Sequence, residues 1–277
     1  MNLTNLTADI NKEDRDGKTP LFDACSSGHE NDVKYLVEHG ADINKENKLD
    51  ETPLFIACSE GHENIIKYLV EHGADINKEN KLGRTPLVEA CLEGHENIVK
   101  YLVEHGTDMN KENRYGLIPL FAPCSMRNIS IVKYMVEHGA DINKENKRGE
   151  TPLFYSMVKE NENVVKYLVE HGANINKEDN DGETPLFRAC LRGSENGVKY
   201  LVEHGADINK ENKFGETPIF DACSFGHENV VKYLVELGAD INKENKLGKT
   251  PLTISKDKKY KTIVNYLKKQ KKYRFNF

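Results

Sequence analysis

Apolar residues recur along the chain in two short helical stripes, and this pair of stripes repeats every 33 residues. In each stripe the apolar residues lie three and four positions apart, which places them on one face of a helix. In the first copy, the first stripe is Leu21, Ala24 and Cys25, and the second is Val33, Leu36 and Val37. The pattern therefore predicts two short helices in each unit.

Capping and breaking residues mark where these helices begin and end. Thr19 is placed to cap the first helix, and Pro20 fits its first position, where a missing N–H has no cost. Gly28 is expected to end the first helix, and the second is expected over 30–38. Gly40 supplies a left-handed stop, after which residues 41–48 cross to the next unit as an extended turn.

Counting in steps of 33 from Asp14, eight units end at Phe277 with nothing left over. The predicted repeats cover 14–46, 47–79, 80–112, 113–145, 146–178, 179–211, 212–244 and 245–277, and they follow a segment 1–13 that copies the end of a repeat. A single helix pair cannot bury both apolar faces, so each unit depends on its neighbours. This organisation is a one-dimensional array.

The recurring motifs resemble those of the ankyrin-repeat family. In the first unit they are Thr19-Pro20-Leu21, Gly28-His29 and Gly40-Ala41-Asp42-Ile43-Asn44. The resemblance covers essentially the whole chain and implies an all-α ankyrin-repeat solenoid, a curved open array of stacked helix-turn-helix units with extended turns. The family's usual histidine after Thr-Pro-Leu is replaced here by Phe22, Phe55, Val88, Phe121, Phe154, Phe187, Phe220 and Thr253. We expect apolar packing to replace the bonds which that histidine makes.

Two units depart from the pattern. In the fourth, Pro123 lies inside the expected first helix, which predicts a kinked or shortened helix. The fifth has Glu160-Asn161 where other units have Gly-His. We therefore expect the array to be least regular between about 117 and 161. Gly197, at an apolar position of a second helix, predicts a smaller defect.

The two ends of the array also differ from its middle. In the eighth unit, Lys256–Lys259 and Lys268–Lys272 replace apolar and turn residues with charge, as a capping repeat with a basic tail requires. The segment 1–13 lacks the helices that would precede it in a repeat. It is expected to be an N-terminal cap, or the remnant of a repeat in a longer protein.

Composition and charge narrow the classes of partner. Only 38% of the residues are hydrophobic and 30% are charged, which suits an elongated stack with much surface. The net charge is −6, but residues 256–277 carry +8, so the rest of the chain carries −14. An acidic body disfavours nucleic acid and attracts basic protein segments. Nothing resembles a signal peptide or membrane span, so we expect a cytoplasmic or nuclear monomer that does not bind membranes.

Candidate catalytic and metal-binding residues recur at equivalent positions, which favours a structural role. Cysteines and histidines repeat along the stack at a spacing of about 8–10 Å, too far apart for disulfides or a shared metal ion. A catalytic nucleophile needs one singular constellation, whereas the Cys25 and His29 pair has four copies. We therefore expect no enzymatic activity, no metal and no cofactor.

Positions that vary between the eight units indicate where a partner binds. They lie at the turn tips and on the first helices, which line the concave groove of the fold that the resemblance implies. Exposed apolar, aromatic and Arg side chains there are typical of binding hot spots. The predicted partner-binding residues are Leu49, Ile56, Leu82, Arg84, Arg114, Tyr115, Met126, Arg148, Tyr155, Arg188, Phe214 and Phe225.

The sequence predicts a scaffold that binds another protein, and two alternatives remain. One is a passive spacer within a larger protein. The other is a nucleotide or RNA sensor, against which the acidic body argues.

Overall fold

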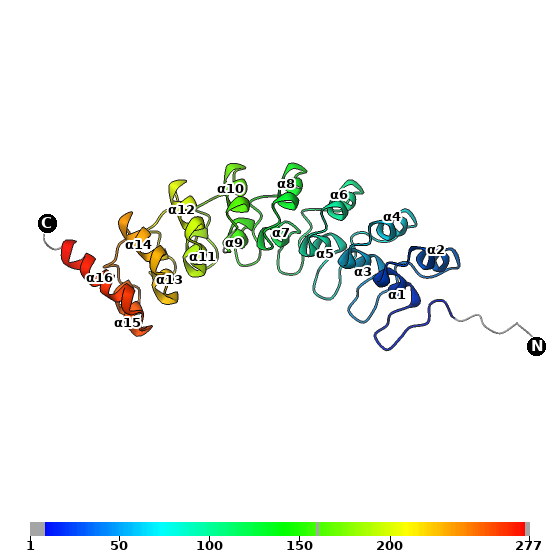
Figure 1. Cartoon of the computed structure of the whole chain (residues 1–277), viewed down its shortest axis with the longest axis horizontal. Coiled ribbons are helices and arrows are strands. Elements are labelled where there is room, and N and C mark those ends of the chain that lie inside the picture. The colour runs from blue at the N-terminus through cyan, green and yellow to red at the C-terminus, as the bar shows by residue number, and fades with distance from the viewer. Residues whose placement is uncertain (1–8, 159–160, 275–277) are drawn as a thin grey trace, which may run out of the picture. The chain divides into compact units, whose positions relative to one another are not determined.

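A computed structural model describes residues 9–158 and 161–274, and within them the chain is a series of helix pairs without strands (Figure 1). The first helices of the pairs are α1 (Pro20–Ser27), α3 (Pro53–Glu60), α5 (Pro86–Glu93), α7 (Phe121–Ser125), α9 (Pro152–Ser156), α11 (Pro185–Arg192), α13 (Pro218–Phe225) and α15 (Pro251–Asp257). The second helices are α2 (Glu30–Glu38), α4 (Glu63–Glu71), α6 (Glu96–Glu104), α8 (Ile129–Glu137), α10 (Glu162–Glu170), α12 (Glu195–Glu203), α14 (Glu228–Glu236) and α16 (Lys261–Arg274). One pair lies within each predicted repeat.

The chain divides into two compact units. The first comprises residues up to Met126 together with Ser130–Ala140, and the second comprises Arg127–Ile129 and residues from Asp141 onwards. Within each unit, consecutive first helices pack against one another, and the first helices other than α7 also pack against the second helix of their own repeat. The division lies within the stretch expected to be least regular.

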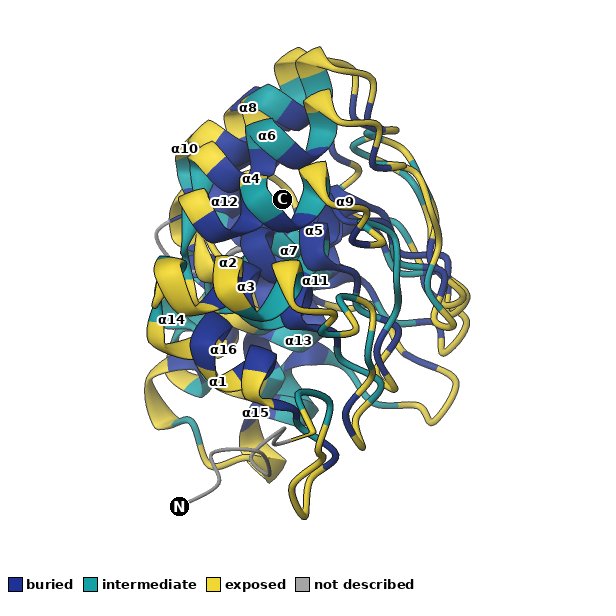
Figure 2. Ribbon diagram, turned by 90° about the vertical axis from the view of Figure 1, so that its right-hand side faces the viewer, coloured by how far each residue is buried: buried dark blue, intermediate teal, exposed yellow. Residues whose placement is uncertain are grey.

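The core of each unit lies between the first and second helices, where Figure 2 shows buried residues gathered, and the connecting loops carry exposed residues interspersed with a few buried ones. Leu54 and Leu87 of the first helices and Leu69 and Leu102 of the second are fully buried. In the first repeat, however, Leu36 and Val37 are only partly buried, so the predicted stripe is incomplete there.

The phenylalanines that follow Thr-Pro-Leu are part of this core. Phe22, Phe187 and Phe220 are each 1% exposed, which confirms the expected apolar packing at that position. At about 25 cal/mol per Å² of apolar surface, burying a side chain of this size contributes roughly 2–3 kcal/mol. Thr253, at the same position in the last repeat, instead completes a capping box with Thr250.

The threonine caps were only partly predicted. The side chains of Thr52, Thr85 and Thr250 accept the expected bond from an amide three residues on. At Thr19, Thr151, Thr184 and Thr217 that amide binds the threonine carbonyl instead, as in Phe22 N to Thr19 O at 2.9 Å. A tight first turn therefore replaces the side-chain cap in these repeats.

The fourth repeat has the short first helix that Pro123 predicts, and the fifth has an equally short one that was not predicted. Helices α7 and α9 contain five residues each, whereas α3, α5 and α11 contain eight. Pro123 cannot donate a backbone bond within α7, and α9 ends at Ser156. Gly197 was expected to be a defect, but α12 continues through it unbroken, with Ser194 Oγ filling the space beside the glycine.

Two ladders of polar side chains hold consecutive repeats and helix ends in place. Asn44 donates to the Gly73 carbonyl and accepts from the Asp75 amide, and the same bridge recurs from repeat to repeat. The His39 ring bonds the Tyr35 carbonyl at 2.7 Å and stacks on the Tyr35 ring. The recurring histidines therefore bind carbonyls at helix ends, as expected from their position.

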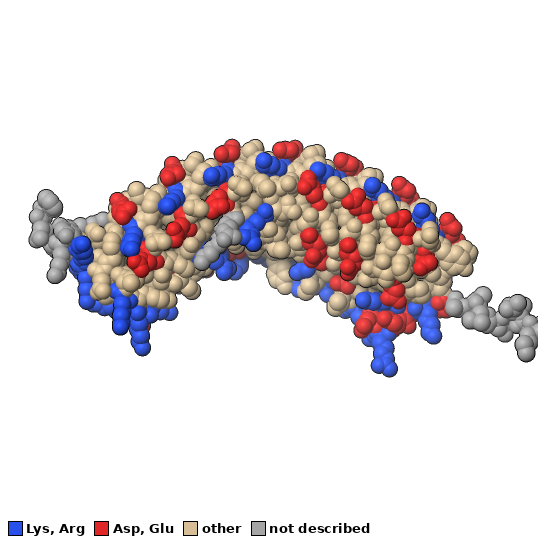
Figure 3. Space-filling view, in the orientation of Figure 1, with Lys and Arg blue, Asp and Glu red and all other residues tan. Residues whose placement is uncertain are grey.

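The described residues include most of the predicted C-terminal cap but only part of the predicted N-terminal segment. In α16, Ile263 and Leu267 are buried, while Lys268, Lys269 and Lys271 are exposed, in keeping with a charged outer surface. Figure 3 shows basic side chains gathered around α15 and α16. Residues 1–8 of the predicted N-terminal segment and the side chain of Lys272 lie outside the described residues.

Candidate functional site

The turns between repeats are held rigid by one recurring polar side chain. In the second repeat, the Asn47 side-chain oxygen accepts from the amides of Leu49 and Glu51 at 2.8 and 3.1 Å. Asn80, Asn113, Asn146, Asp179, Asn212 and Asn245 repeat this arrangement. Such Asx turns fix the backbone locally, so the side chains at the turn tips are presented with little remaining freedom.

Within each unit, backbone bonds also connect neighbouring turns. Lys81 N donates to Leu49 O at 2.9 Å in the first unit, and Lys246 N donates to Phe214 O at 2.9 Å in the second. We call the residues at the equivalent outer position the tip residues: Asp16, Leu49, Leu82, Tyr115, Arg148, Asp181, Phe214 and Leu247. Each unit thus presents a row of tip residues on a connected backbone.

Several tip residues expose large apolar side chains. Leu49 and Leu82 are 56% and 52% exposed in the first unit, and Phe214 is 55% exposed in the second. Tyr115, Met126 and Phe225 are exposed to a similar extent, the last two at the ends of first helices. These six predicted residues therefore lie on the surface as expected.

The other predicted residues of the first unit make specific contacts. Arg84 pairs with the buried Glu89 at 3.3 Å, and burial raises the pKa of that carboxyl although Arg84 opposes the shift. The Arg114 guanidinium lies over the Tyr115 ring at 4.9 Å, and Ile56 is half-buried on α3. The Arg84 side chain is therefore already engaged in an ion pair within the protein. Arg114 and Tyr115, in contrast, are both exposed to solvent.

In the second unit the structure corrects one prediction. Tyr155 was expected to be exposed, but it is half-buried and its hydroxyl accepts a bond from Asn146 at 3.2 Å. Arg188 is also half-buried and donates to Glu150, while Arg148 is exposed. A single sequence could not show that Tyr155 and Arg188 face inwards, because their partners come from other repeats or turns.

Sequence reasoning missed an acidic row in this unit. Glu150, Glu183 and Glu216 occupy the position before Thr-Pro in three consecutive repeats, and each accepts a bond from a buried Asn side chain. Asp221 on α13 lies beside them. Burial, together with Glu183 and Glu216, raises the pKa of Asp221 to about 8. The recurrence of Glu at a spacing of 33 residues is the signal that could have found the row.

The chain matches the family model of ankyrin repeats over residues 2–80, 77–146, 121–212 and 207–276. The chain belongs to the ankyrin-repeat family. Ankyrin repeats are generally modules of protein–protein interaction, and the family is typically non-enzymatic. A sequence comparison with curated proteins gives no match.

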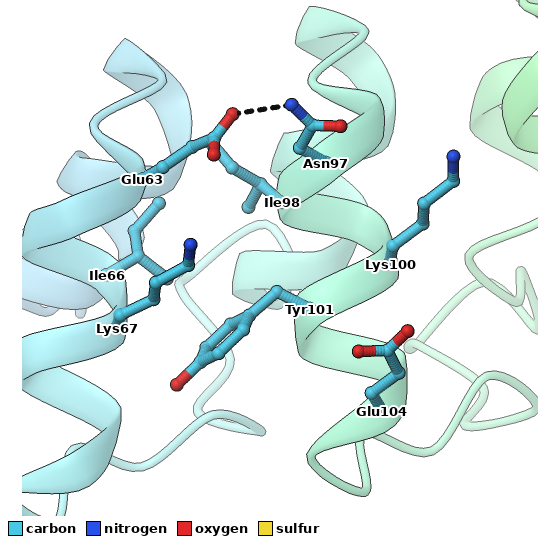
Figure 4. A pocket seen from close by; sticks show the side chains of 8 residues that line it. All are labelled: Glu63, Ile66, Lys67, Asn97, Ile98, Lys100, Tyr101 and Glu104. Atoms are coloured by element: carbon cyan, nitrogen blue, oxygen red, sulfur yellow. Dashed lines mark hydrogen bonds between the residues drawn. The ribbon is translucent and has the colours of Figure 1, made fainter.

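A second surface of these ankyrin repeats lies between consecutive second helices. Figure 4 shows a groove between α4 and α6 where Glu63 accepts a bond from Asn97 at 2.9 Å and Lys67 lies near the Tyr101 ring. An equivalent groove lies between α12 and α14. Because the residues that line it recur in most repeats, this surface belongs to the scaffold and carries little to distinguish one partner from another.

The cysteines and histidines of the ankyrin repeats offer no reactive centre in the described part of the chain. All six cysteines are buried free thiols, and burial raises the pKa of Cys25 and Cys223 to about 12. Across residues 9–158 and 161–274, no three metal-ligating side chains converge on one point. No helix in these ranges is both long and apolar enough to cross a bilayer.

Proposed function

We propose that this ankyrin-repeat chain is a scaffold that binds a partner protein through its tip residues and the first-helix positions beside them. The observation that carries the proposal is the combination of rigid turns with exposed apolar side chains. Among the described residues, seven large apolar side chains at the tips and first-helix ends are at least half exposed, among them Leu82, Tyr115 and Phe214. Aromatic and aliphatic groups at such exposure are typical of interaction sites, since they gain most from burial against a partner.

The rigidity of the turns also supports the proposed scaffold, because it lowers the entropic cost of binding a partner. Because the Asx turns and the bonds between turns already order the backbone, a partner meets a pre-formed surface and little conformational entropy is lost on association. A passive spacer would need no exposed aromatic residues at its tips. We therefore prefer the scaffold to the spacer.

The test is capture of proteins from the lysate of the native host on the immobilised chain. In the test variant, Tyr115, Phe214 and Phe225 are replaced by Ser. In the matched control, Tyr35→Ser and Leu237→Ser remove apolar side chains that are 60% and 44% exposed but belong to α2 and to the end of α14. Both variants retain the core, so circular dichroism should show unchanged helix content.

We expect a protein that is captured by the unaltered chain and the control, and lost with the test variant. Empty or identical profiles for all three chains would contradict the scaffold and favour the spacer. Loss with the control alone would move the binding surface to the second helices.

A further inference from the structure

The acidic row of the second unit is incompletely neutralised. Arg188 pairs with Glu150 at one end of the row. Lys249, which occupies the row position of the last repeat, pairs with Asp257 at 2.7 Å instead. Within the described residues, neither Glu216 nor Asp221 makes an ion pair. Asp221 lies near Glu183 and Glu216, and the guanidinium near Glu183 and Asp221 is that of Arg188, which is already bound to Glu150.

The preceding repeat shows which group fits this position. One oxygen of Glu150 accepts from Asn146 at 2.9 Å, and the other binds the Arg188 guanidinium. One repeat further, a Glu183 oxygen accepts from Asn212 at 3.3 Å, and in the next a Glu216 oxygen accepts from Asn245 at 2.7 Å. The remaining oxygen of Glu216 has no hydrogen-bond donor among the described residues. The asparagine that binds Glu150 belongs to the same turn, whereas those that bind Glu183 and Glu216 belong to the turn of the next repeat. The glutamate at this position thus binds a guanidinium in one repeat, at Glu150, and lacks one in another, at Glu216.

Apolar side chains flank this opening. Phe214 lies two residues before Glu216 on the same rigid turn, and Phe225 lies four residues after Asp221, on the same face of α13. Both rings are more than half exposed. A cationic side chain that enters the row would therefore bring its neighbours against two aromatic rings, an arrangement suited to a hot spot.

We propose that Glu183, Glu216 and Asp221 form a receptor for an arginine side chain of a partner protein, with apolar residues next to that arginine packing on Phe214 and Phe225. The inference rests on the proposed function and names the partner's chemistry. Arginine is favoured over lysine because its planar fork binds carboxylates in the bidentate way and is less costly to desolvate. These carboxylates do not converge on a metal site.

Protonation of the row supports the same conclusion. The groups facing Asp221 are Glu183, Glu216, Arg188 and the buried thiol of Cys190. Burial and the two glutamates raise the pKa of Asp221 to about 8, and burial raises that of Glu183 as well. At neutral pH the empty site therefore holds a proton in place of a cation. An incoming guanidinium displaces that proton, so binding should strengthen as the pH rises from 6 to 9.

The experiment is a selection of random dodecapeptides displayed on phage against the full chain at pH 8. The peptide with the tightest binding is then synthesised with its arginine and, as a twin, with citrulline, which keeps the shape and removes the charge. Fluorescence anisotropy gives the Kd of both peptides for the unaltered chain, for Glu216→Gln, and for Asp23→Asn. Asp23 occupies the position equivalent to Asp221 on α1 and is the matched control.

We expect arginine in the selected peptides and a loss of affinity of about tenfold or more with citrulline or with Glu216→Gln, as for a charge-assisted bond. Asp23→Asn should stay within about twofold. The arginine peptide should bind more tightly at pH 9 than at pH 6, and the affinity of its citrulline twin should not change with pH in this way. Selected peptides without arginine, or an arginine peptide indifferent to Glu216→Gln and to pH, would overturn the receptor.

The two proposals fail in different ways. A peptide that loses affinity with Phe214→Ser but not with Glu216→Gln would overturn the arginine receptor and leave the scaffold standing. A library that yields no binder would also overturn the receptor. The scaffold itself is decided by the capture experiment, whose variants leave every carboxylate of the row in place.

Discussion

At the scale of single residues, Asp221 connects the acidic row to stability. Its pKa is about 8 in the folded chain against an ordinary value of 3.8, so the folded state retains a proton that the unfolded state has lost. Between these values the folded state binds more protons, and stability therefore falls as the pH rises from about 4 to about 8. The physical cause is burial of a carboxyl group among other carboxyl groups.

We predict that Asp221→Asn stabilises the protein at pH 8 and leaves its stability unchanged near pH 3.5. The amide keeps the shape of the protonated acid and never acquires the charge, so the gain at pH 8 is at most about 5 kcal/mol. Urea unfolding at the two pH values measures the difference. Asp23→Asn, at the exposed equivalent position, should show no such pH-dependent gain. Equal effects of the two substitutions would contradict the account.

The exposure of a residue could be predicted from the sequence only where the conformation of a single turn determines the direction of its side chain. Leu49, Leu82 and Phe214 are exposed because an Asx turn points the tip residue outwards in every repeat. Tyr155 and Arg188 occupy a first-helix position whose environment includes Asn146 and Glu150 of the turn that precedes α9. Their burial depends on side-chain pairs between a helix and a turn, nine residues apart for Tyr155 and 38 for Arg188, and periodicity does not encode these pairs.

At the scale of elements, glycines end most of the helices in two different settings. Gly61 has φ of 82°, and a Cβ there would lie 2.7 Å from the His95 ring. That ring is held by a bond to the Ser59 carbonyl at 3.0 Å and cannot retreat freely. Gly73 has φ of 90°, but a Cβ there meets nothing within 4 Å. A side chain at Gly73 would therefore meet backbone strain only, whereas a side chain at Gly61 would meet backbone strain and a steric clash with His95.

We predict that Gly73→Ala costs about 1–2 kcal/mol, the penalty for a left-handed residue that carries a Cβ. Gly61→Ala should cost more, roughly 2–4 kcal/mol, because the His95 ring must also move. Urea unfolding of both variants provides the comparison, and His95→Ala combined with Gly61→Ala should recover the excess. If the two single substitutions cost the same, the His95 contact contributes nothing.

The two helices of a regular repeat could be predicted closely, because capping and breaking signals mark their ends. The structure agrees on the second helix at Glu30–Glu38 and on a short first helix in the fourth repeat, whereas the short α9 of the fifth repeat was not predicted. The expected side-chain cap forms at Thr52, Thr85 and Thr250 but not at Thr19, because two acceptors on one threonine compete for the same amide. Sequence patterns place the threonine but cannot choose between its carbonyl and its hydroxyl.

At the scale of the whole chain, stability in a stacked array is a sum of repeat terms and nearest-neighbour terms. The period of 33 residues predicted this architecture, and the family match agrees with it. The division into two compact units was not predicted as such. It coincides with the repeats whose first helices are shortest.

Each unit should therefore open without the other. Leu102 on α6 and Leu201 on α12 are equivalent, fully buried residues, one in each unit, and replacing either by Ala should cost about 2–5 kcal/mol. We predict that Leu102→Ala accelerates native-state hydrogen exchange in α5 and α6 and leaves α13 and α14 protected, and that Leu201→Ala accelerates exchange in α11 to α14 and spares α3. Mass spectrometry of peptic fragments resolves these segments. If either substitution accelerated exchange equally along the whole chain, the array would unfold as one cooperative body, and the short helices α7 and α9 would not be a boundary.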